Sequence, residues 1–104
     1  MYKIDKVYDN KELVSIIFRK TNRKIKKQIQ FFTENKLPFQ VGLLNHPKTH
    51  KIIPHQHKKK IKKIQHTSEF LFLINGKVRV NFFDKHKKKI DSKTIKTGDM
   101  ILLI

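Results

Sequence analysis

The residues of this chain best suited to chemistry are two histidines and one glutamate. His55 and His57 are separated by one residue, so in an extended strand both imidazoles project from one face and can ligate one ion. Glu69 begins an apolar stretch, and six residues separate it from Gly76. An inward carboxylate at that position needs a partner. Two imidazoles and a carboxylate suit a divalent metal such as Fe, Zn, Mn or Ni, and the His pair also suits a polar strand edge.

The other four histidines are weaker candidates for metal ligands. His46 and His50 lie near turns, where a loop histidine is usually solvated. His66 stands three residues before Glu69 and could replace a displaced ligand, whereas His86 lies in a Lys-rich loop and should be exposed. The sequence has no Cys, so any metal must use nitrogen or oxygen ligands. It has no Ser-His-Asp order and no Gly-rich phosphate loop, and it specifies no enzyme class.

Short β-prone runs that must position these residues recur along the whole chain. A stretch at 25–32 fits either a helical face or a strand, and we favour a strand. Many short strands at this spacing predict an all-β sandwich or barrel. The other predicted strands cover residues 2–8, 13–18, 39–44, 51–57, 69–74, 77–83, 90–95 and 100–104.

Residues 69–83 carry the clearest local pattern, two β-rich runs joined by Asn75 and Gly76. This dipeptide favours the two positive-φ positions of a type I′ turn, which predicts a hairpin. Both faces of the first run are apolar apart from Glu69, so we expect a central strand. Residues 84–89 then predict an exposed loop, and residues 96–99 a turn into the last strand.

The excess of basic residues suggests a second possible function, the binding of a polyanion. The chain has 25 basic and 8 acidic residues, a formal net charge of +17, which would suit nucleic acid or another polyanion. Only three of the basic residues are Arg and the lysines are spread along the chain, whereas base and phosphate recognition favours the guanidinium fork. We therefore favour a compositional origin of the charge. A noncatalytic protein that binds polyanions through its Lys-rich surface is the alternative.

Length and hydropathy bound the class of protein. A chain of 104 residues has room for one domain. Its first residues lack the apolar core of a signal peptide. No apolar run reaches the roughly 18 residues that span a bilayer. We therefore expect a cytoplasmic protein with no membrane partner.

The segments PHQH, TSEFLFLINGKVRVNFFD and KTGDMILLI resemble the first cupin motif, G-x5-H-x-H-x3,4-E-x6-G, and its flanking strands. Eleven residues rather than three or four separate His57 from Glu69, and no Gly stands six positions before His55. Residues 31–104 are also similar to a branch of bacterial cupins that share HPKG, PHxH, TxEVL and GKVRVDFYD segments. His46 stands where that branch has His, and His50 where it has Gly.

The resemblance implies one cupin-type jelly-roll domain over 1–104, with N-terminal strands in 1–38 and the cupin core in 39–104. It implies metal ligation by His55, His57 and Glu69, and a sugar-like ligand in sugar or surface-polysaccharide metabolism. In such cupins a GDxxLL segment leads to a Gly-Gly-His-Gly turn with the remaining ligand, and this sequence ends before it. The resemblance thus implies a barrel incomplete at the C-terminus. Residues 100–104 should then be an unprotected edge, which favours a homo-oligomer such as a dimer.

Overall fold

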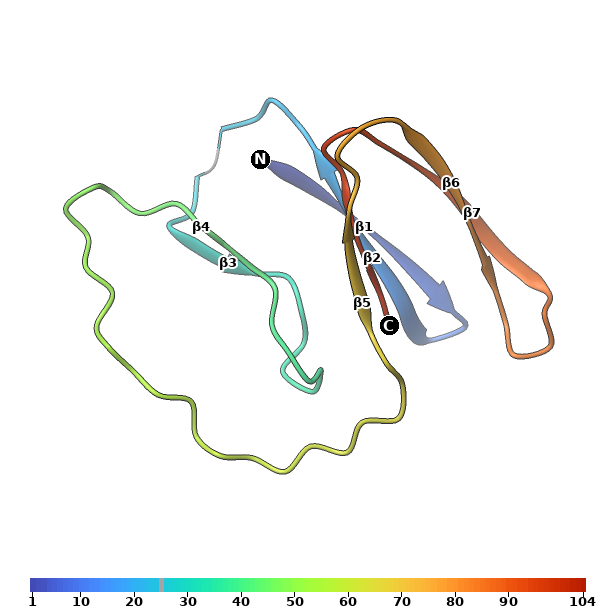
Figure 1. The fold of residues 1–104 in the computed structure, drawn as a ribbon, viewed down its shortest axis with the longest axis horizontal. Helices are drawn as coiled ribbons and strands as arrows, with labels where there is room; N and C mark the ends of the chain where they lie inside the picture. The colour runs from blue at the N-terminus through green and yellow to red at the C-terminus, as the bar shows by residue number, and fades with distance from the viewer. Residues whose placement is uncertain (25) are drawn as a thin grey trace. The chain divides into compact units, whose positions relative to one another are not determined.

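The computed structural model describes residues 1–24 and 26–104, which form eight β-strands and no helix (Figure 1). The all-β prediction is therefore confirmed. Ile25, the first residue of the ambiguous 25–32 stretch, lies outside the described residues, and the remainder of that stretch contains one short strand. The strands are β1 Tyr2–Asp9, β2 Glu12–Lys20, β3 Ile29–Phe31, β4 Gly42–Leu44, β5 Glu69–Phe72, β6 Lys77–Phe83, β7 Lys89–Lys96 and β8 Met100–Leu103.

The chain divides into two compact units. The first unit comprises Met1–Arg23 and His66–Ile104, and the second comprises Lys24–Gln65. In the first unit β1, β2, β8 and β5 form an antiparallel sheet in that order, and β6 pairs with β7 in a separate antiparallel ribbon. Among the described residues these sheets do not close into a barrel. A single domain divided at residue 38 and a cupin jelly roll stay predictions.

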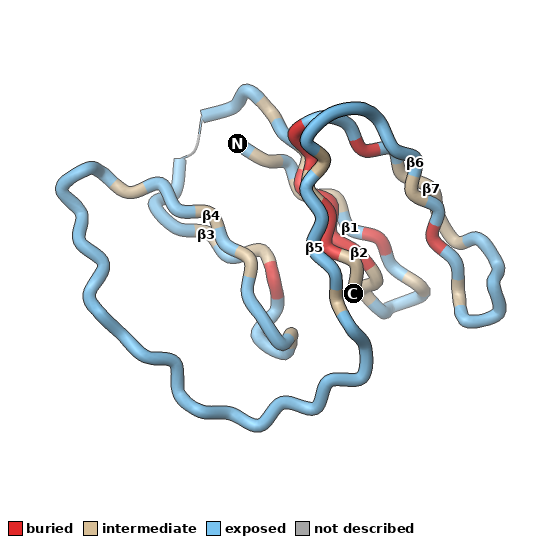
Figure 2. Tube along the Cα trace, in the orientation of Figure 1, coloured by how far each residue is buried: buried red, intermediate tan, exposed pale blue. Residues whose placement is uncertain are grey.

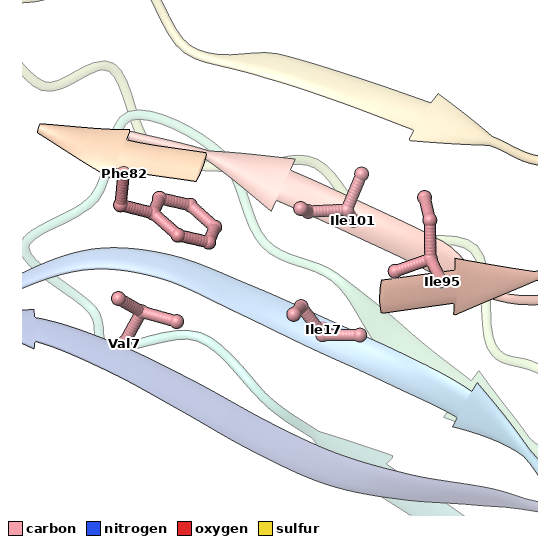
Figure 3. Packing of buried hydrophobic residues seen from close by; sticks show 5 residues of the cluster. All are labelled: Val7, Ile17, Phe82, Ile95 and Ile101. Carbon is pink, nitrogen blue, oxygen red and sulfur yellow. The ribbon is translucent and has the colours of Figure 1, made fainter. Parts of the chain in front are cut away.

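The hydrophobic core of the first unit lies between its two sheets. Val7, Ile17 and Ile101 come from the four-stranded sheet, and Phe82 and Ile95 come from the ribbon. Figure 3 shows these five side chains gathered between the strands. Each is at most 8% exposed, and burying a side chain of this size contributes about 1.5–3 kcal/mol. This packing makes the first unit a two-layer antiparallel β-structure.

The C-terminal strand β8 lies inside the sheet, between β2 and β5. Ile101 and Leu102 are 1% and 0% exposed, although they point to opposite faces. Apolar side chains on both faces are the expected pattern of a central strand. The prediction that residues 100–104 form an unprotected edge is therefore wrong, because β5 pairs along their free side.

The predicted hairpin at residues 69–83 is also wrong. β5 pairs with β8 and β6 pairs with β7, so the chain passes from one sheet to the other at Asn75 and Gly76. Only Gly76 has a positive φ there, 111°, so a type I′ turn does not form. Long-range pairing prevents the hairpin. The Leu73 backbone N–H donates to the Asp99 carbonyl oxygen, and the Leu73 carbonyl oxygen accepts from the Gly98 N–H. β5 is consequently an exposed edge strand and not a central one.

Two other turns of the first unit agree with the sequence. β6 and β7 are joined by an exposed loop in which the Asp84 carboxylate accepts the backbone N–H groups of His86 and Lys88 at 2.8 and 2.9 Å. The turn before β8 has Gly98 at φ 89° and a fully buried Asp99. The Asp99 carboxylate accepts the backbone N–H groups of Lys20 and Lys96, both at 2.9 Å. It thereby ties the ends of β2 and β7 to the start of β8.

The second unit is built on the two-stranded ribbon of β3 and β4 and a long segment without strands. The predicted strand at 39–44 is shorter than expected, Gly42–Leu44. The predicted strand at 51–57 does not form. Pro54 has no N–H to donate to a ladder, and the segment has no pairing strand among the described residues. Figure 2 shows residues 51–65 exposed throughout.

Candidate functional site

The two histidines predicted as metal ligands lie close together. His55 and His57 have ring centroids 5.6 Å apart with an interplanar angle of 47°. The His55 Nδ1 atom lies 3.0 Å from the Ile53 carbonyl oxygen. A carbonyl can only accept, so Nδ1 of a neutral His55 carries the proton and Nε2 keeps a free lone pair. Both imidazoles are exposed in a strandless segment, so their proximity comes from spacing and not from a sheet.

Glu69 is the first residue of β5 and is exposed at the edge of its sheet. The prediction of an inward Glu69 in an apolar interior is therefore wrong, because the residue is exposed. Glu69 belongs to the first unit and the His pair to the second, so the convergence of the three residues stays a prediction. Within residues 1–24 and 26–104, no group of three or more His, Asp or Glu side chains is placed to hold a metal ion.

Two of the four remaining histidines form a further pair. His46 and His50 stack with ring centroids 4.0 Å apart and an interplanar angle of 12°. Nearly parallel rings direct their nitrogen lone pairs side by side, which does not bring them onto one ion. The His46 Nδ1 atom lies 3.3 Å from the Gln28 side-chain oxygen. His66 is exposed, and His86 is exposed in its loop as predicted.

The second unit contains an open hollow of about 840 Å³, which we call the basic hollow. It combines positive charge with exposed apolar surface, since Phe31 is 59% and Ile64 is 63% exposed. The sequence-based predictions do not include this hollow. The lining residues are Phe31, Asn35, Pro38, Gln40, His57, Lys58, Lys60, Lys62 and Ile64.

Hydrogen bonds within the second unit hold the walls of the basic hollow in place. Lys62 Nζ donates to the carbonyl oxygens of Leu37 at 2.9 Å and Asn35 at 3.4 Å, which fastens the Lys-rich segment to the turn after β3. That turn is held by Thr33, whose hydroxyl donates to the Gln40 side-chain oxygen at 2.8 Å and accepts from the Val41 N–H at 3.0 Å. The hollow is therefore built by tertiary contacts within residues 24–65.

Gly42 controls the position of the Phe31 ring. The two residues are cross-strand partners in the β3–β4 ribbon. A Cβ atom on Gly42 would lie 2.8 Å from the nearest ring carbon of Phe31, well inside van der Waals contact. The missing side chain therefore lets the ring lie against the backbone of β4.

The electrostatic field of the second unit is positive. Residues 24–65 contain eleven lysines and a single acidic residue, Glu34. Glu34 is paired with Lys36 at 3.2 Å. Across the part of the chain that the structure describes, none of the three lysines lining the hollow forms an ion pair. The charges of Lys58 and Lys60 are therefore available to a ligand, whereas Lys62 already donates to the carbonyl oxygens of Leu37 and Asn35.

The sequence contains a pattern that points to one wall of the basic hollow. The lining residues Lys58, Lys60, Lys62 and Ile64 alternate, and alternate residues of an extended segment project to one side. This alternation alone does not predict a concave surface, because a hollow also needs an opposite wall. The opposite wall, at Asn35 and Pro38, lies twenty or more residues earlier in the sequence.

The first unit has a charged cluster with a different role. Asp5 accepts from Arg19 at 3.0 Å and lies 3.5 Å from Lys93 Nζ. Burial alone would raise the pKa of Asp5, but the hydrogen bond from Arg19 and the positive charges of Lys93 and Arg19 outweigh it and lower the pKa below its ordinary value of 3.8. The cluster joins β1, β2 and β7, so it stabilises the packing of the two sheets.

Comparison with protein-family models, with curated proteins and with solved structures finds no match for this chain. The similarity to cupins stays an expectation based on the sequence motifs. The described residues contain no helix of the length and hydropathy needed to cross a bilayer.

Proposed function

We propose that this chain binds polyanions through the basic hollow of its second unit. The observation that carries the proposal is a concave surface whose charged residues are lysines without carboxylate partners among the described residues. Lys ammonium groups act as point charges that track phosphate or sulfate without bidentate geometry. A low Arg content is therefore compatible with binding that does not discriminate sequence.

The concentration of charge in one unit supports this function over a purely compositional origin. Residues 24–65 have a formal charge of +10, from eleven lysines and one glutamate. A cleft lined by one sign of charge raises the local concentration of oppositely charged ligands and their association rate. We therefore expect fast, weak binding that depends strongly on salt.

The test compares two double variants in competition anisotropy with long-chain polyphosphate and a labelled oligonucleotide. K58Q/K60Q removes two charges from the hollow and leaves Lys62, which fastens its wall. K85Q/K88Q is the matched control, with two exposed lysines of the β6–β7 loop. Affinity should fall steeply between about 50 and 200 mM salt. K58Q/K60Q should reduce the slope for a single strand by about 1.4, because each phosphate contact contributes about 0.7.

Two results would contradict the proposal. One is no binding by the parent protein near 50 mM salt, a regime in which such contacts are strong. The other is an equal loss of affinity in K58Q/K60Q and K85Q/K88Q, which would attribute binding to net charge and not to the hollow. Circular dichroism of each variant checks that both units keep their strand content.

A second proposal concerns a cupin-like metal site at His55 and His57. It is supported by the antiparallel two-layer fold of the first unit, by the 5.6 Å separation of the two rings and by the Nε2 atom that the His55 hydrogen bond leaves available. The His pair fits one ion only in part, because two imidazoles leave most positions to water or another ligand. Under the cupin hypothesis Glu69 supplies a third ligand, and the site serves a sugar-like ligand of surface-polysaccharide metabolism.

Titration calorimetry with Zn²⁺, Mn²⁺, Ni²⁺ and, without oxygen, Fe²⁺ tests this second proposal. H55A should abolish stoichiometric binding, and E69Q should weaken it if Glu69 is a ligand. H86A is the control, since His86 lies in the exposed β6–β7 loop. Acid should release the ion, because a protonated imidazole cannot ligate a metal. Equal affinities in H55A and H86A would exclude the His pair.

A further inference from the structure

From the composition of the basic hollow we infer that its ligand is single-stranded nucleic acid. The inference rests on the proposed polyanion function and names its substrate class. The hollow places the ring of Phe31 and the apolar side chains of Pro38 and Ile64 in the same concavity as three lysines. A polyphosphate or a sulfated sugar needs only the charges. A strand with unpaired bases uses both surfaces, because bases stack on aromatic rings while lysines follow the phosphates.

Phe31 is suited to stacking because its ring is exposed and held in position. The side chain is 59% exposed at the end of β3. Its ring lies against Gly42, the cross-strand partner without a side chain. A ring already in position loses little conformational entropy when a base stacks on it.

The polar groups of the hollow point to binding without sequence preference. The Gln40 side chain is bonded to the turn after β3, since Oε1 accepts from Thr33 and Nε2 donates to the Glu34 carbonyl oxygen at 3.1 Å. These two bonds fix the orientation of the Gln40 side chain within the turn. Stacking tolerates every base because each one has a π-face. Lys58 and Lys60 supply point charges that follow phosphates, without the planar fork of a guanidinium group.

The same composition disfavours a duplex. Paired bases keep their faces inside the helical stack and show a protein only edges and phosphates. A duplex could use Lys58 and Lys60 but would leave the Phe31 ring without a partner. We therefore expect single strands to bind more tightly than a duplex of equal length and to compete for the hollow with polyphosphate.

Phe31 provides a direct test because the chain has no Trp. In F31W the indole is the only tryptophan fluorophore, and stacking of a base should quench its emission. Addition of a short oligothymidylate should quench F31W strongly, and addition of polyphosphate should leave the emission unchanged although it binds. F83W is the matched control, because Phe83 is 56% exposed in β6 of the other unit. Its emission should not respond to either ligand.

Affinity measurements complete the test. F31A should lower the affinity for oligothymidylate about tenfold, leave the affinity for polyphosphate unchanged, and contrast with F83A, which should match the parent. F31Y keeps a ring and should keep the affinity, so it separates stacking from misfolding. Unquenched F31W, or equal affinities of F31A and F31Y, would overturn the inference. The proposed polyanion function would still stand if K58Q/K60Q lost binding, so the two failures are distinguishable.

Discussion

Replacing Asp99 with alanine should destabilise the first unit more than any exposed acidic substitution. The carboxylate is fully buried and accepts two backbone N–H groups, from Lys20 and Lys96, both at 2.9 Å. A hydrogen bond to a charged group contributes about 1.5–3 kcal/mol, so the loss of two should cost about 3–6 kcal/mol. That is a large fraction of the roughly 5–15 kcal/mol that stabilises a typical domain. D99N should cost less, since its amide oxygen can still accept one of the two bonds.

Urea denaturation followed by far-UV circular dichroism measures this free energy of unfolding. D84A is the matched control, because Asp84 also accepts two backbone N–H groups but does so in an exposed loop. We expect D84A to cost about 1 kcal/mol or less, since water replaces the lost bonds. The m-value should be the same for all variants. If D99A and D84A were equally stable, the turn at Asp99 would not hold the ends of β2 and β7 together.

Three further perturbations test the arrangement of the first unit. Because the pKa of folded Asp5 is lowered, the stability that Asp5 contributes is present above pH 3.8 and is lost as the pH falls through the folded pKa. The difference in urea midpoint between the parent and D5N should therefore shrink as the pH is lowered below 3.8. L102K should unfold the protein, because Leu102 is 0% exposed in a central strand, and a folded L102K with unchanged melting temperature would refute that placement. L71K puts charge on the exposed edge strand β5, where Leu71 is 48% exposed. If the expected homo-oligomer forms through that edge, light scattering should show a lower mass for L71K and an unchanged mass for K85Q/K88Q.

The positions of several strands could be predicted from local composition. Residues 77–83 match β6, residues 2–8 differ from β1 by one residue at the C-terminal end, and residues 90–95 differ from β7 by one residue at each end. These runs are rich in β-branched and aromatic residues, which favour extended backbone wherever they pair. The run at 51–57 has a similar composition at its start but forms no strand. Its backbone groups find no partner strand, and a strand exists only in a ladder.

The candidate site was predictable only where the relevant residues are neighbours in sequence. The spacing of His55 and His57 is enough to bring their rings close, even without the expected strand. The basic hollow depends on contacts between Lys62 and the turn at Leu37, 25 residues apart. No local pattern encodes that contact.

The amino-acid sequence by itself determined the all-β character, the positive charge and the turn at Gly98, because each depends on residue type or on a few adjacent φ and ψ angles. The tertiary structure decided which strands lie at an edge and which surface is concave. β5 and β8 are both short apolar strands, yet β8 is buried between β2 and β5 while β5 is exposed. The physical reason is that burial follows from pairing partners, and partners are chosen by packing between segments far apart in the chain.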